Sequence, residues 1–576
     1  MDNAIIADAL NLYQKSRDYR QEVETSWREL ADQYMECFAT DSTSRKTKVK
    51  SKLGFQAVQR FVSKTKKPER RFLTSDIDPL ALEIAKDGVN TVQERGGLND
   101  ALNTNWGIMS KNSWYGTSFL HVMPNTEEDG MLNDYRPVLY RQANLQDVFI
   151  DPFATHMRSE GMVQAATEVF VRYTVSYDQA ERMFPNKEFS RGALPMSYDD
   201  YNRIDMSASQ SKEQQGDKVE IGYYYNIAKK KPIQAILIGA TAKIVSKLEG
   251  DSYPYFLKKM KGGFVDPFIP LIAFKCFPVP KGFYGRGLGH LLHDLTVIQQ
   301  KLRELAMKQV EDQVNPVNIM NIQGDPKDFW GQYNEVRHQR AKGEKGFIMN
   351  VVQEGGVPSS AGSITSLQTQ ALTQEYERFM TDIVNEVKRC GIPIDDIDRP
   401  VSETATATIA EETRATAFVQ QVQEQNSDAY KDIDLFTMAI LRDMGDENSE
   451  TPIYTQAKLQ APQEAQVLPQ EAVTYGALVD LLNTYDFAVD VQGRTGALKT
   501  DLAQKAELSE LMSYAQGTPL LAKLIGKRLR MAHLGYNDED IQAIEQSVSE
   551  GQPKPQQQGA GNKESVRALQ EALQPV

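Results

Sequence analysis

The chain has 576 residues and a formal net charge of −13, with 40% hydrophobic and 25% charged residues. This composition is typical of a globular protein and excludes a disordered or fibrous one, and the length suffices for roughly four domains of ordinary size or fewer elongated ones. The longest apolar runs, AILIGA and PLIAF, are far too short to cross a bilayer. The N-terminal residues are charged and amphipathic and do not read as a signal peptide. We therefore expect assembly in a cytoplasm, without membrane contact.

Cysteines and charge are both unevenly placed. Cys37, Cys276 and Cys390 are an odd number at wide spacing, which fits neither a disulfide framework nor a zinc site, so we expect reduced, buried thiols.

Residues 45–71 hold eleven Lys and Arg against one Glu, a charge of +10 that leaves −23 for the rest. Such a block can contact nucleic acid or form a solvated face that complements an acidic neighbour.

The first elements in chain order are helices, followed by strands. Apolar stripes at helical spacing predict helices within 1–40 and 79–123. After this, apolar residues recur at about every second position. Short runs rich in β-forming residues, separated by Pro, Gly and Asn, predict strands between 137 and 280. The polar stretch 186–218 lacks a strong period and predicts a surface excursion. The predicted strands are PVLYRQA, DVFIDP, EVFVRYTV, VEIGYYYNI, QAILIG and PLIAFKCFPV.

Three alternating glycines, Gly285, Gly287 and Gly289, precede a long helical pattern. Glycines ahead of a helix can cradle a phosphate at the helix N-terminus. Here the G-x-G-x-x-G spacing fails at His290, and no G-x-x-x-x-G-K-[ST] run occurs in the chain. The entry to a structural helix is therefore favoured over a phosphate cradle. That helix ends before the Asn-Pro pair at 315–316 and would be about 40 Å long.

Apolar residues at alternating steps of three and four form a heptad seam on this helix. The seam suits packing against another helix, although an ordinary amphipathic core helix shows the same pattern. The opposite face is polar, and we expect it to be wet. The seam consists of Leu288, Leu291, Leu295, Ile298, Leu302 and Leu305, and the polar face of His290, His293, Gln300, Arg303, Glu304, Lys308 and Glu311.

Beyond this helix, candidate strands at 317–322 and 346–351 predict a small α/β tip, and a second long helix follows at about 366–389. Residues 391–407 contain two prolines and cannot be helical throughout. Thr408 and Glu411 then form a capping box that opens a helix running to about residue 444, roughly 54 Å long. The chain from 447 is Gln-rich and helical in pattern, and it ends in a low-complexity linker.

No group of residues makes a persuasive catalytic site. His290, His293 and Asp294 lie within one helical turn but lack the i,i+4 pair of the helical zinc motif. The aspartates of YDDY (198–201) and DDID (395–398) could hold a divalent ion, as nuclease carboxylates do, although adjacent aspartates in loops are more often solvated turn residues. We therefore expect no enzyme activity, no cofactor and no metal.

The order of these elements resembles that of the portal proteins of tailed bacteriophages, the head-to-tail connectors, above all those of short-tailed phages. Three local stretches are similar to family patterns. PFIPLIAFKCFPVPKGFYGRGLGHLLHDLTVIQQKL resembles the family's strand, Tyr-Gly-x-Gly and helix, DVFIDPFATHMRSEG resembles an Asp-Pro strand end, and SETATATIAEETRAT resembles the entry to a long helix. The likeness spans residues 100–445.

The resemblance implies an α+β, mainly helical portal fold with wing, stem, clip and crown, assembled as a ring that has twelve copies in the family. It implies these divisions: 1–285 N-terminal wing, 286–314 first stem helix, 315–365 clip, 366–390 second stem helix, 391–408 tunnel loop, 409–446 wing spine helix, 447–550 crown and 551–576 flexible C-terminal tail.

The resemblance also implies a function. Portal proteins form the double-stranded DNA channel at one capsid vertex, serve genome packaging, head–tail joining and genome ejection, and reside in the virion after assembly in the host cytoplasm. The expected partners are other copies of the chain, the terminase large subunit, the major capsid and scaffolding proteins, and tail adaptors. In this family a separate terminase ATPase drives the DNA into the capsid, which agrees with the absence of a nucleotide-binding motif from this sequence.

On this interpretation, the mixed charge of the polar face lets DNA slide, because few fixed phosphate contacts form. Two other functions stay open, a metal-dependent nuclease that uses the aspartates at 198–201 or 395–398 and an adaptor without a through-channel. The expected channel-facing residues are Gln300, Arg303, Glu304, Lys308, Arg399, Ser402 and Thr404, the expected clip docking residues are Arg337, Arg340, Lys342 and Lys345, and the heptad seam would pack the stem.

Overall fold

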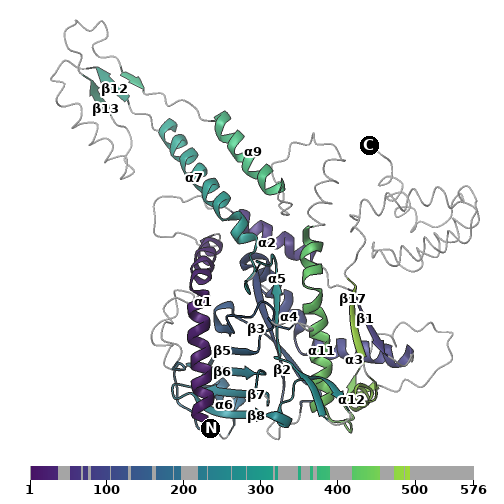
Figure 1. The fold of residues 1–576 in the computed structure, drawn as a ribbon. Helices are drawn as coiled ribbons and strands as arrows, with labels where there is room; N and C mark the ends of the chain where they lie inside the picture. Colours follow the sequence, from purple (N-terminus) through teal and green to yellow (C-terminus); the bar gives the residue numbers. More distant parts are fainter. Residues whose placement is uncertain are drawn as a thin grey trace, which may run out of the picture.

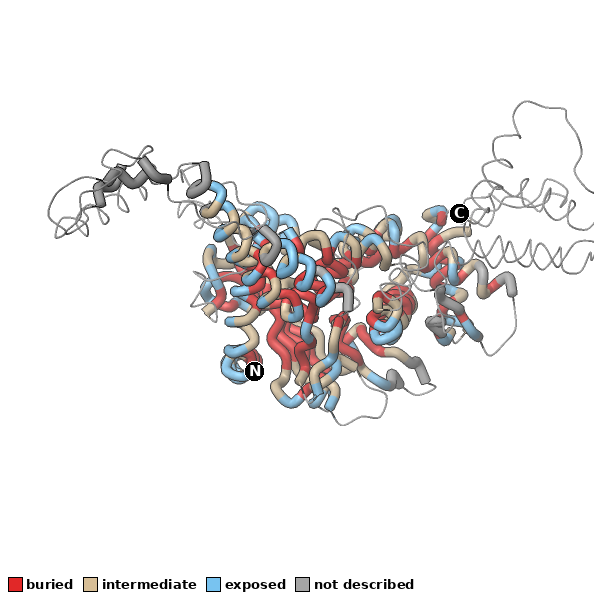
Figure 2. The backbone as a smooth tube through the Cα atoms, turned by 90° about the horizontal axis from the view of Figure 1, so that it is seen from above, coloured by how far each residue is buried: buried red, intermediate tan, exposed pale blue. Residues whose placement is uncertain are grey.

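An α+β body carries two projecting helices, α7 (Leu288–Val314) and α9 (Thr373–Arg389), in the computed structural model of the chain (Figure 1). Buried residues concentrate in the body when the molecule is seen from above (Figure 2). The described residues are 2–36, 52–65, 69–74, 79–103, 106–126, 132–158, 164–185, 187–195, 218–229, 231–260, 263–280, 282–314, 318–321, 348–351, 364–366, 373–389, 418–453, 473–485 and 487–492.

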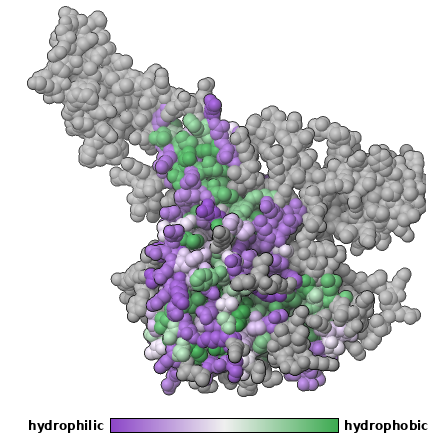
Figure 3. Space-filling model, in the orientation of Figure 1, coloured by the Kyte–Doolittle hydropathy of each residue, from purple (hydrophilic) through white to green (hydrophobic). Residues whose placement is uncertain are grey.

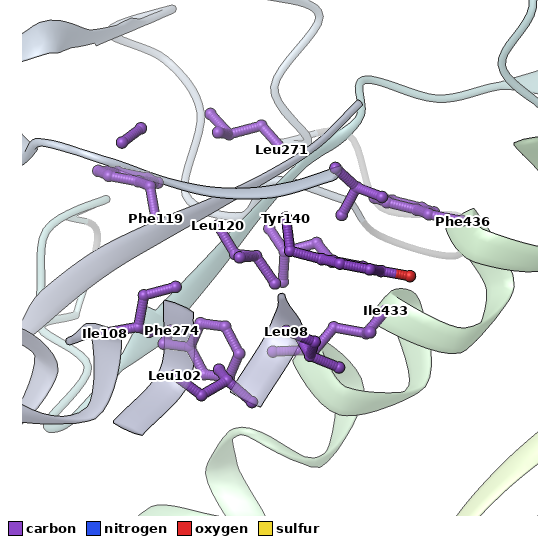
Figure 4. Close-up of a cluster of buried hydrophobic side chains, with 14 of the residues drawn as sticks. Leu98, Leu102, Ile108, Phe119, Leu120, Tyr140, Leu271, Phe274, Ile433 and Phe436 are labelled. Carbon is purple, nitrogen blue, oxygen red and sulfur yellow. The ribbon is translucent and has the colours of Figure 1, made fainter. Parts of the chain in front are cut away.

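A three-stranded antiparallel sheet lies at the centre of the body. Its order is β11 (Leu271–Lys275), β2 (Thr117–Pro124), β3 (Val138–Ala143), and β2 is buried along nearly its whole length. Helices α5 (Ile108–Tyr115) and α11 (Ser427–Met444) both contact this sheet. The core between them, shown in Figure 4, includes Leu98, Leu102, Ile108, Phe119, Leu120, Tyr140, Leu271, Phe274, Ile433 and Phe436.

A five-stranded antiparallel sheet forms the second layer and is covered by α1 (Asp2–Glu36). Arg20 of α1 fastens the helix to the edge strand, because its guanidinium donates to the carbonyls of Gln146 and Val148 at 2.6 and 2.5 Å and lies 4.0 Å from the ring centroid of Phe149. The strands, in sheet order, are β4 (Val148–Ile150), β5 (Glu168–Ser176), β6 (Lys218–Asn226), β7 (Ile233–Ile238) and β8 (Lys243–Glu249).

Shorter elements make up the rest of the described chain. Strand β1 pairs antiparallel with β17, so the end of the basic block lies beside a segment more than 400 residues later in the chain. The remaining elements are α2 (Leu53–Lys64), β1 (Glu69–Thr74), α3 (Pro79–Arg95), α4 (Leu98–Asn103), η1 (Leu145–Asp147), α6 (Tyr177–Met183), η4 (Gly250–Ser252), β9 (Phe256–Met260), β10 (Gly263–Pro267), β12 (Asn318–Asn321), β13 (Ile348–Val351), β14 (Ile364–Ser366), β15 (Pro452–Ile453), β16 (Val473–Thr474), α12 (Tyr475–Thr484) and β17 (Phe487–Gln492).

A buried histidine links the two larger sheets. His121 of β2 is fully buried, and its Nδ1 and Nε2 lie 2.9 and 2.8 Å from the hydroxyls of Tyr173 in β5 and Tyr225 in β6. Burial, together with the charge of Arg141, lowers the pKa of His121 to about 3. The ring therefore stays neutral at neutral pH, with one nitrogen donating and the other accepting.

The prediction of a mainly helical portal fold is wrong for the described part of the chain. About half of those residues, 52%, are helical and 25% are in strands, and several antiparallel sheets, including the five-stranded one, build the core. The strands were underestimated because β1 and β17 have no partner nearby in the chain, and because β2 is buried along nearly its whole length and therefore lacks alternation.

Several individual elements agree with expectation, and some do not. Helices α1, α7 and α9 and strands β3 to β7, β11, β12 and β13 lie where the residue patterns predict them. The helical prediction for 79–123 is wrong at its end, because 117–124 is strand β2. Residues 187–195 of the expected surface excursion are described, and there Leu194 is buried against the five-stranded sheet.

We predict that His121→Gln destabilises the protein in a pH-dependent way. The folded protein keeps His121 neutral down to about pH 3, whereas the unfolded chain protonates it below its ordinary pKa of 6.5. As the pH falls from 6.5 towards 3, the free energy of unfolding therefore falls by about 1.4 kcal/mol per pH unit. The variant should be less stable at pH 7, and its deficit should shrink by about 2 kcal/mol at pH 5. Urea unfolding at the two pH values measures this, and a constant deficit would contradict it.

Candidate functional site

The two projecting helices and their base form the candidate site. Helix α7 has 27 residues and contacts α9, which has 17. Both leave the α+β body in the same direction (Figure 1). Ile383 and Val387 of α9 are buried, whereas the outer half of α7 exposes several large apolar side chains. The helix pair is therefore anchored at one end and open along much of its surface.

The base is a close approach of two backbone segments, residues 113–116 and 285–289. A Cβ atom on Gly287 would lie 2.3 Å from the Trp114 carbonyl oxygen, and one on Gly289 would lie 2.7 Å from the same atom. Gly116 ends α5 with φ +89°, a conformation that favours glycine, and a Cβ there would lie 2.2 Å from the carbonyl carbon of Arg286. The glycines before α7 are required because the chain's own backbone occupies the space beside them. This packing supports the structural-helix interpretation over the phosphate cradle.

Hydrogen bonds fasten the same junction. The Gly285 N–H donates to Thr117 Oγ1 at 2.8 Å, and the Cys276 N–H donates to the Gly116 carbonyl at 3.0 Å. Phe277 and Arg286 exchange two backbone hydrogen bonds, at 3.0 and 2.8 Å. Strand β11, the end of α5 and the start of α7 are thus joined into one unit.

Trp114 is the side chain around which this unit packs. It is fully buried, and its Nε1–H donates to the Leu30 carbonyl of α1 at 2.9 Å. A Cβ on Gly54 of α2 would lie 2.6 Å from the Trp114 ring, and one on Gly289 of α7 would lie 3.0 Å from it. No local pattern in the sequence marks this residue, because its partners lie 60 to 175 positions away.

The two histidines at the start of α7 contact their own chain. His290 Nδ1 accepts from the Gly287 N–H at 3.2 Å, and burial together with Arg286 and His293 lowers the pKa of His290 to about 4. His293 Nδ1 lies 3.1 Å from Gln33 Oε1, and Gln33 Nε2 donates to the His293 carbonyl at 3.3 Å. Both rings are half-buried, so the expectation that they lie on a wet face is wrong. They dock α7 onto α1 and its own first turn.

The heptad seam divides into two halves. Leu288 is buried and Leu295 and Leu302 are half-buried, so this half of the seam is the one that the chain itself covers. Leu291, Ile298 and Leu305 alternate with them and are 46%, 47% and 59% exposed. The buried side of α7 also includes Leu292, Thr296 and Gln299. The seam is therefore not a single contact face in one copy of the chain.

Other predicted site residues are placed in part. Gln300 is half-buried and donates to the exposed Glu304 at 3.4 Å, and Arg303 is half-buried. Lys308 lies within α7, but its side chain is outside the described part of the structure. Outside the described residues lie Arg399, Ser402 and Thr404 of the channel set, Arg337, Arg340, Lys342 and Lys345 of the clip set, and both aspartate clusters, 198–201 and 395–398.

The predicted long helix 409–444 is interrupted in its described part. A helical segment at 418–425 is followed by a turn at Asn426 and then by α11. Asn426 Oδ1 accepts from the Lys275 N–H at 2.7 Å, while its Nδ2 donates to the carbonyls of Lys275 and Val422 at 2.8 and 2.7 Å. The side chain thereby pairs with the edge strand β11 and competes with regular helix hydrogen bonding. The predicted capping box at 408–411 lies outside the described residues.

Cys276 is buried with a free thiol, as expected, and burial raises the pKa of that thiol. Cys37 and Cys390 lie outside the described residues. Within the described ranges, no three His, Cys, Asp or Glu side chains gather in a way that could hold a metal ion. None of the described helices combines the length and the apolar character that a bilayer crossing requires.

Two comparisons with known proteins found no match. No protein-family model matches the chain, and no curated protein sequence matches it. A functional proposal therefore depends on the residues of this chain and on the resemblance of its motifs.

We predict that Gly287→Ala disrupts the base of α7. The added methyl group would meet three backbone atoms of residues 113–116 at 2.3 to 2.6 Å, so the free energy of unfolding should fall by about 1–3 kcal/mol. Gly282→Ala is the matched control, because its Cβ would meet nothing closer than 3.7 Å and should change stability by less than about 0.5 kcal/mol. Chemical denaturation compares the two variants, and equal stabilities would show that the base is not tightly packed.

Proposed function

We propose that this chain is a portal protein, a head-to-tail connector that forms the DNA channel at one vertex of a bacteriophage capsid. In this role copies of the chain assemble as a ring in the host cytoplasm and remain in the virion. The ring admits DNA during terminase-driven packaging, joins head to tail and releases the genome on ejection. The chain itself performs no catalysis in this proposal.

The observation that carries the proposal is the helix pair α7 and α9, which projects from the body and, among the described residues, is packed tightly at its base. An exposed apolar surface on a projecting element marks a contact with another protein. A ring supplies such contacts on both sides of each copy through a heterologous interface that closes by rotation. The rigid backbone junction at the base would hold every copy of the pair at the same angle, as a symmetric channel requires.

The charges of α7 support passage of DNA over capture. Exposed Lys301 and half-buried Arg303 stand beside Glu304 and the neutral Gln300, so charges of both signs occur within little more than one helical turn. Each phosphate that a protein neutralises adds salt-dependent affinity. A wall of mixed sign makes few lasting phosphate contacts, and the net charge of −13 also opposes retention of DNA.

The remaining partners follow from the same proposal. The segment between α7 and α9 includes Arg337, Arg340, Lys342 and Lys345, which we propose as docking residues for the terminase large subunit and tail adaptors. The body and the C-terminal part would contact the major capsid protein and the scaffolding protein.

Electron microscopy of the purified full chain tests the proposal. We expect rings with rotational symmetry and an axial hole of about 20 Å or more, which a hydrated, charged duplex needs. A closed assembly without a hole would favour an adaptor and contradict the channel.

A DNA cleavage assay with Mg²⁺ separates the proposal from the nuclease alternative. We expect no cleavage by the chain as it stands. Cleavage that Asp200→Ala or Asp396→Ala abolishes would instead assign the protein to metal-dependent DNA processing.

A further inference from the structure

A buried hydroxyl without a partner lies where α11 meets α12. Tyr475, the first residue of α12, is fully buried, and its hydroxyl makes no hydrogen bond within the described part of the chain. A Cβ on Gly445, directly after α11, would lie 3.2 Å from the hydroxyl oxygen. Because an unpaired buried hydroxyl is costly, such a group in a folded protein usually contacts a water or an ion.

Two carboxylates act on the same hydroxyl. Burial raises the pKa of Tyr475, and the negative charges of Asp134 and Asp446 raise it further. Asp134 lies in the bend before β3, Asp446 follows the end of α11 by two residues, and both side chains are half-buried. The unpaired hydroxyl is therefore in a region of negative potential.

Each carboxylate keeps one oxygen available. Asp134 Oδ2 accepts from Ser449 Oγ at 2.6 Å and from Thr451 Oγ1 at 3.4 Å. Asp446 Oδ1 accepts from the backbone and side-chain amides of Asn448 at 2.9 and 3.4 Å. Asp134 Oδ1 and Asp446 Oδ2 accept no hydrogen bond from the described residues. With the tyrosine hydroxyl, three oxygen atoms stay available at this contact.

The carboxylates are not needed as caps of α12. The Tyr475 N–H donates to the Thr451 carbonyl at 2.7 Å. The Gly476 N–H donates to the Ser449 carbonyl at 3.0 Å, and the Thr474 hydroxyl accepts from a third amide at 3.3 Å. The first amides of the helix are thus bonded by other groups. The two charges add instead to the negative C-terminal end of α11, which favours a cation.

A calcium ion fits this set of oxygens better than a water molecule does. A water could pair with the hydroxyl, but it would leave two half-buried carboxylates that repel each other. Ca²⁺ takes about six to eight oxygen ligands in flexible geometry, whereas Mg²⁺ demands a near-ideal octahedron. Two carboxylates and a hydroxyl also agree with the absence of a triplet of His, Cys, Asp or Glu side chains from the described ranges.

We propose that Asp134, Asp446 and the Tyr475 hydroxyl bind a calcium ion, which fastens the start of α12 to the end of α11 and to the bend before β3. The expectation from the sequence that the chain holds no metal would then be wrong at this site. More than 300 positions separate Asp134 from the other two ligands, so no local motif marks the set.

The calcium site is separate from the surface that the proposed ring uses. It lies at the end of the body opposite the projecting helices (Figure 1). Hydrophobic side chains gather over those helices in the space-filling view (Figure 3). The calcium proposal therefore goes beyond the proposed function and does not rest on it.

Calorimetric titration of the full chain with CaCl₂, after removal of metal with EDTA, tests the site. We expect a Kd of about 10⁻⁴–10⁻³ M and at least about 10-fold weaker binding by Asp134→Asn and by Asp446→Asn, because each removes a charged ligand. Asp18→Asn is the matched control, since Asp18 is exposed on α1, away from α12 in Figure 1. Equal affinities of the Asp134→Asn and Asp18→Asn chains, or no binding by the wild type, would overturn the proposal.

Tyr475→Phe tests the hydroxyl while keeping the buried ring. We expect about 3- to 10-fold weaker Ca²⁺ binding, because one ligand is lost. Tb³⁺ occupies the oxygen sites of Ca²⁺ and emits light when a neighbouring tyrosine ring absorbs. The wild type should therefore show Tb³⁺ emission that Ca²⁺ abolishes and that Tyr475→Phe reduces. An unchanged Ca²⁺ affinity in this variant would show that the hydroxyl is no ligand and would overturn the proposal.

Thermal unfolding gives a further readout, because an ion that binds only the folded chain raises the Tm. Ca²⁺ should raise the Tm of the wild type relative to EDTA and should leave that of Asp134→Asn unchanged. Equal shifts in both chains would contradict the site. Rings that bind no Ca²⁺ would overturn the calcium site alone, and a chain that binds Ca²⁺ as expected but forms no ring would overturn the channel alone.

Discussion

The contact between the backbones of residues 113–116 and 285–289 is the constraint on which the rest of the structure depends. Gly116, Gly285, Gly287 and Gly289 allow the end of α5 to meet the start of α7 with no side chain between them. Trp114 then contacts α1, α2 and α7 from one position. Because backbone atoms cannot yield as flexible side chains do, this junction sets the direction in which α7 leaves the body.

Buried polar groups complete the body around that junction. His121 joins the two larger sheets through two tyrosine hydroxyls, Arg20 joins α1 to the edge of the five-stranded sheet, and Asn426 joins α11 to strand β11. Each of these groups would be costly if buried without its partners. Together they explain why sheets and helices that lie far apart in the chain occupy one compact body, and why that body can support a projecting helix pair.

Function, in the proposal made above, comes from the part of the molecule that a single copy leaves uncovered. One half of the α7 seam is covered by the chain itself and the other half is exposed. The mixed charges beside it suit a wall past which DNA moves.

Elements with a local signal could be predicted from the residues alone. The seven-residue repeat from Leu288 to Leu305 was enough to place α7, and short β-rich runs bounded by Pro, Gly and Asn were enough to place β3 to β7. Other features became visible only in the fold: 117–124 is a central strand, β1 pairs with β17, Asn426 interrupts a long helix, and one half of the seam is covered while the other is exposed. The physical reason is that these outcomes depend on partners tens to hundreds of residues away, and neither periodicity nor composition carries information about which distant segments meet.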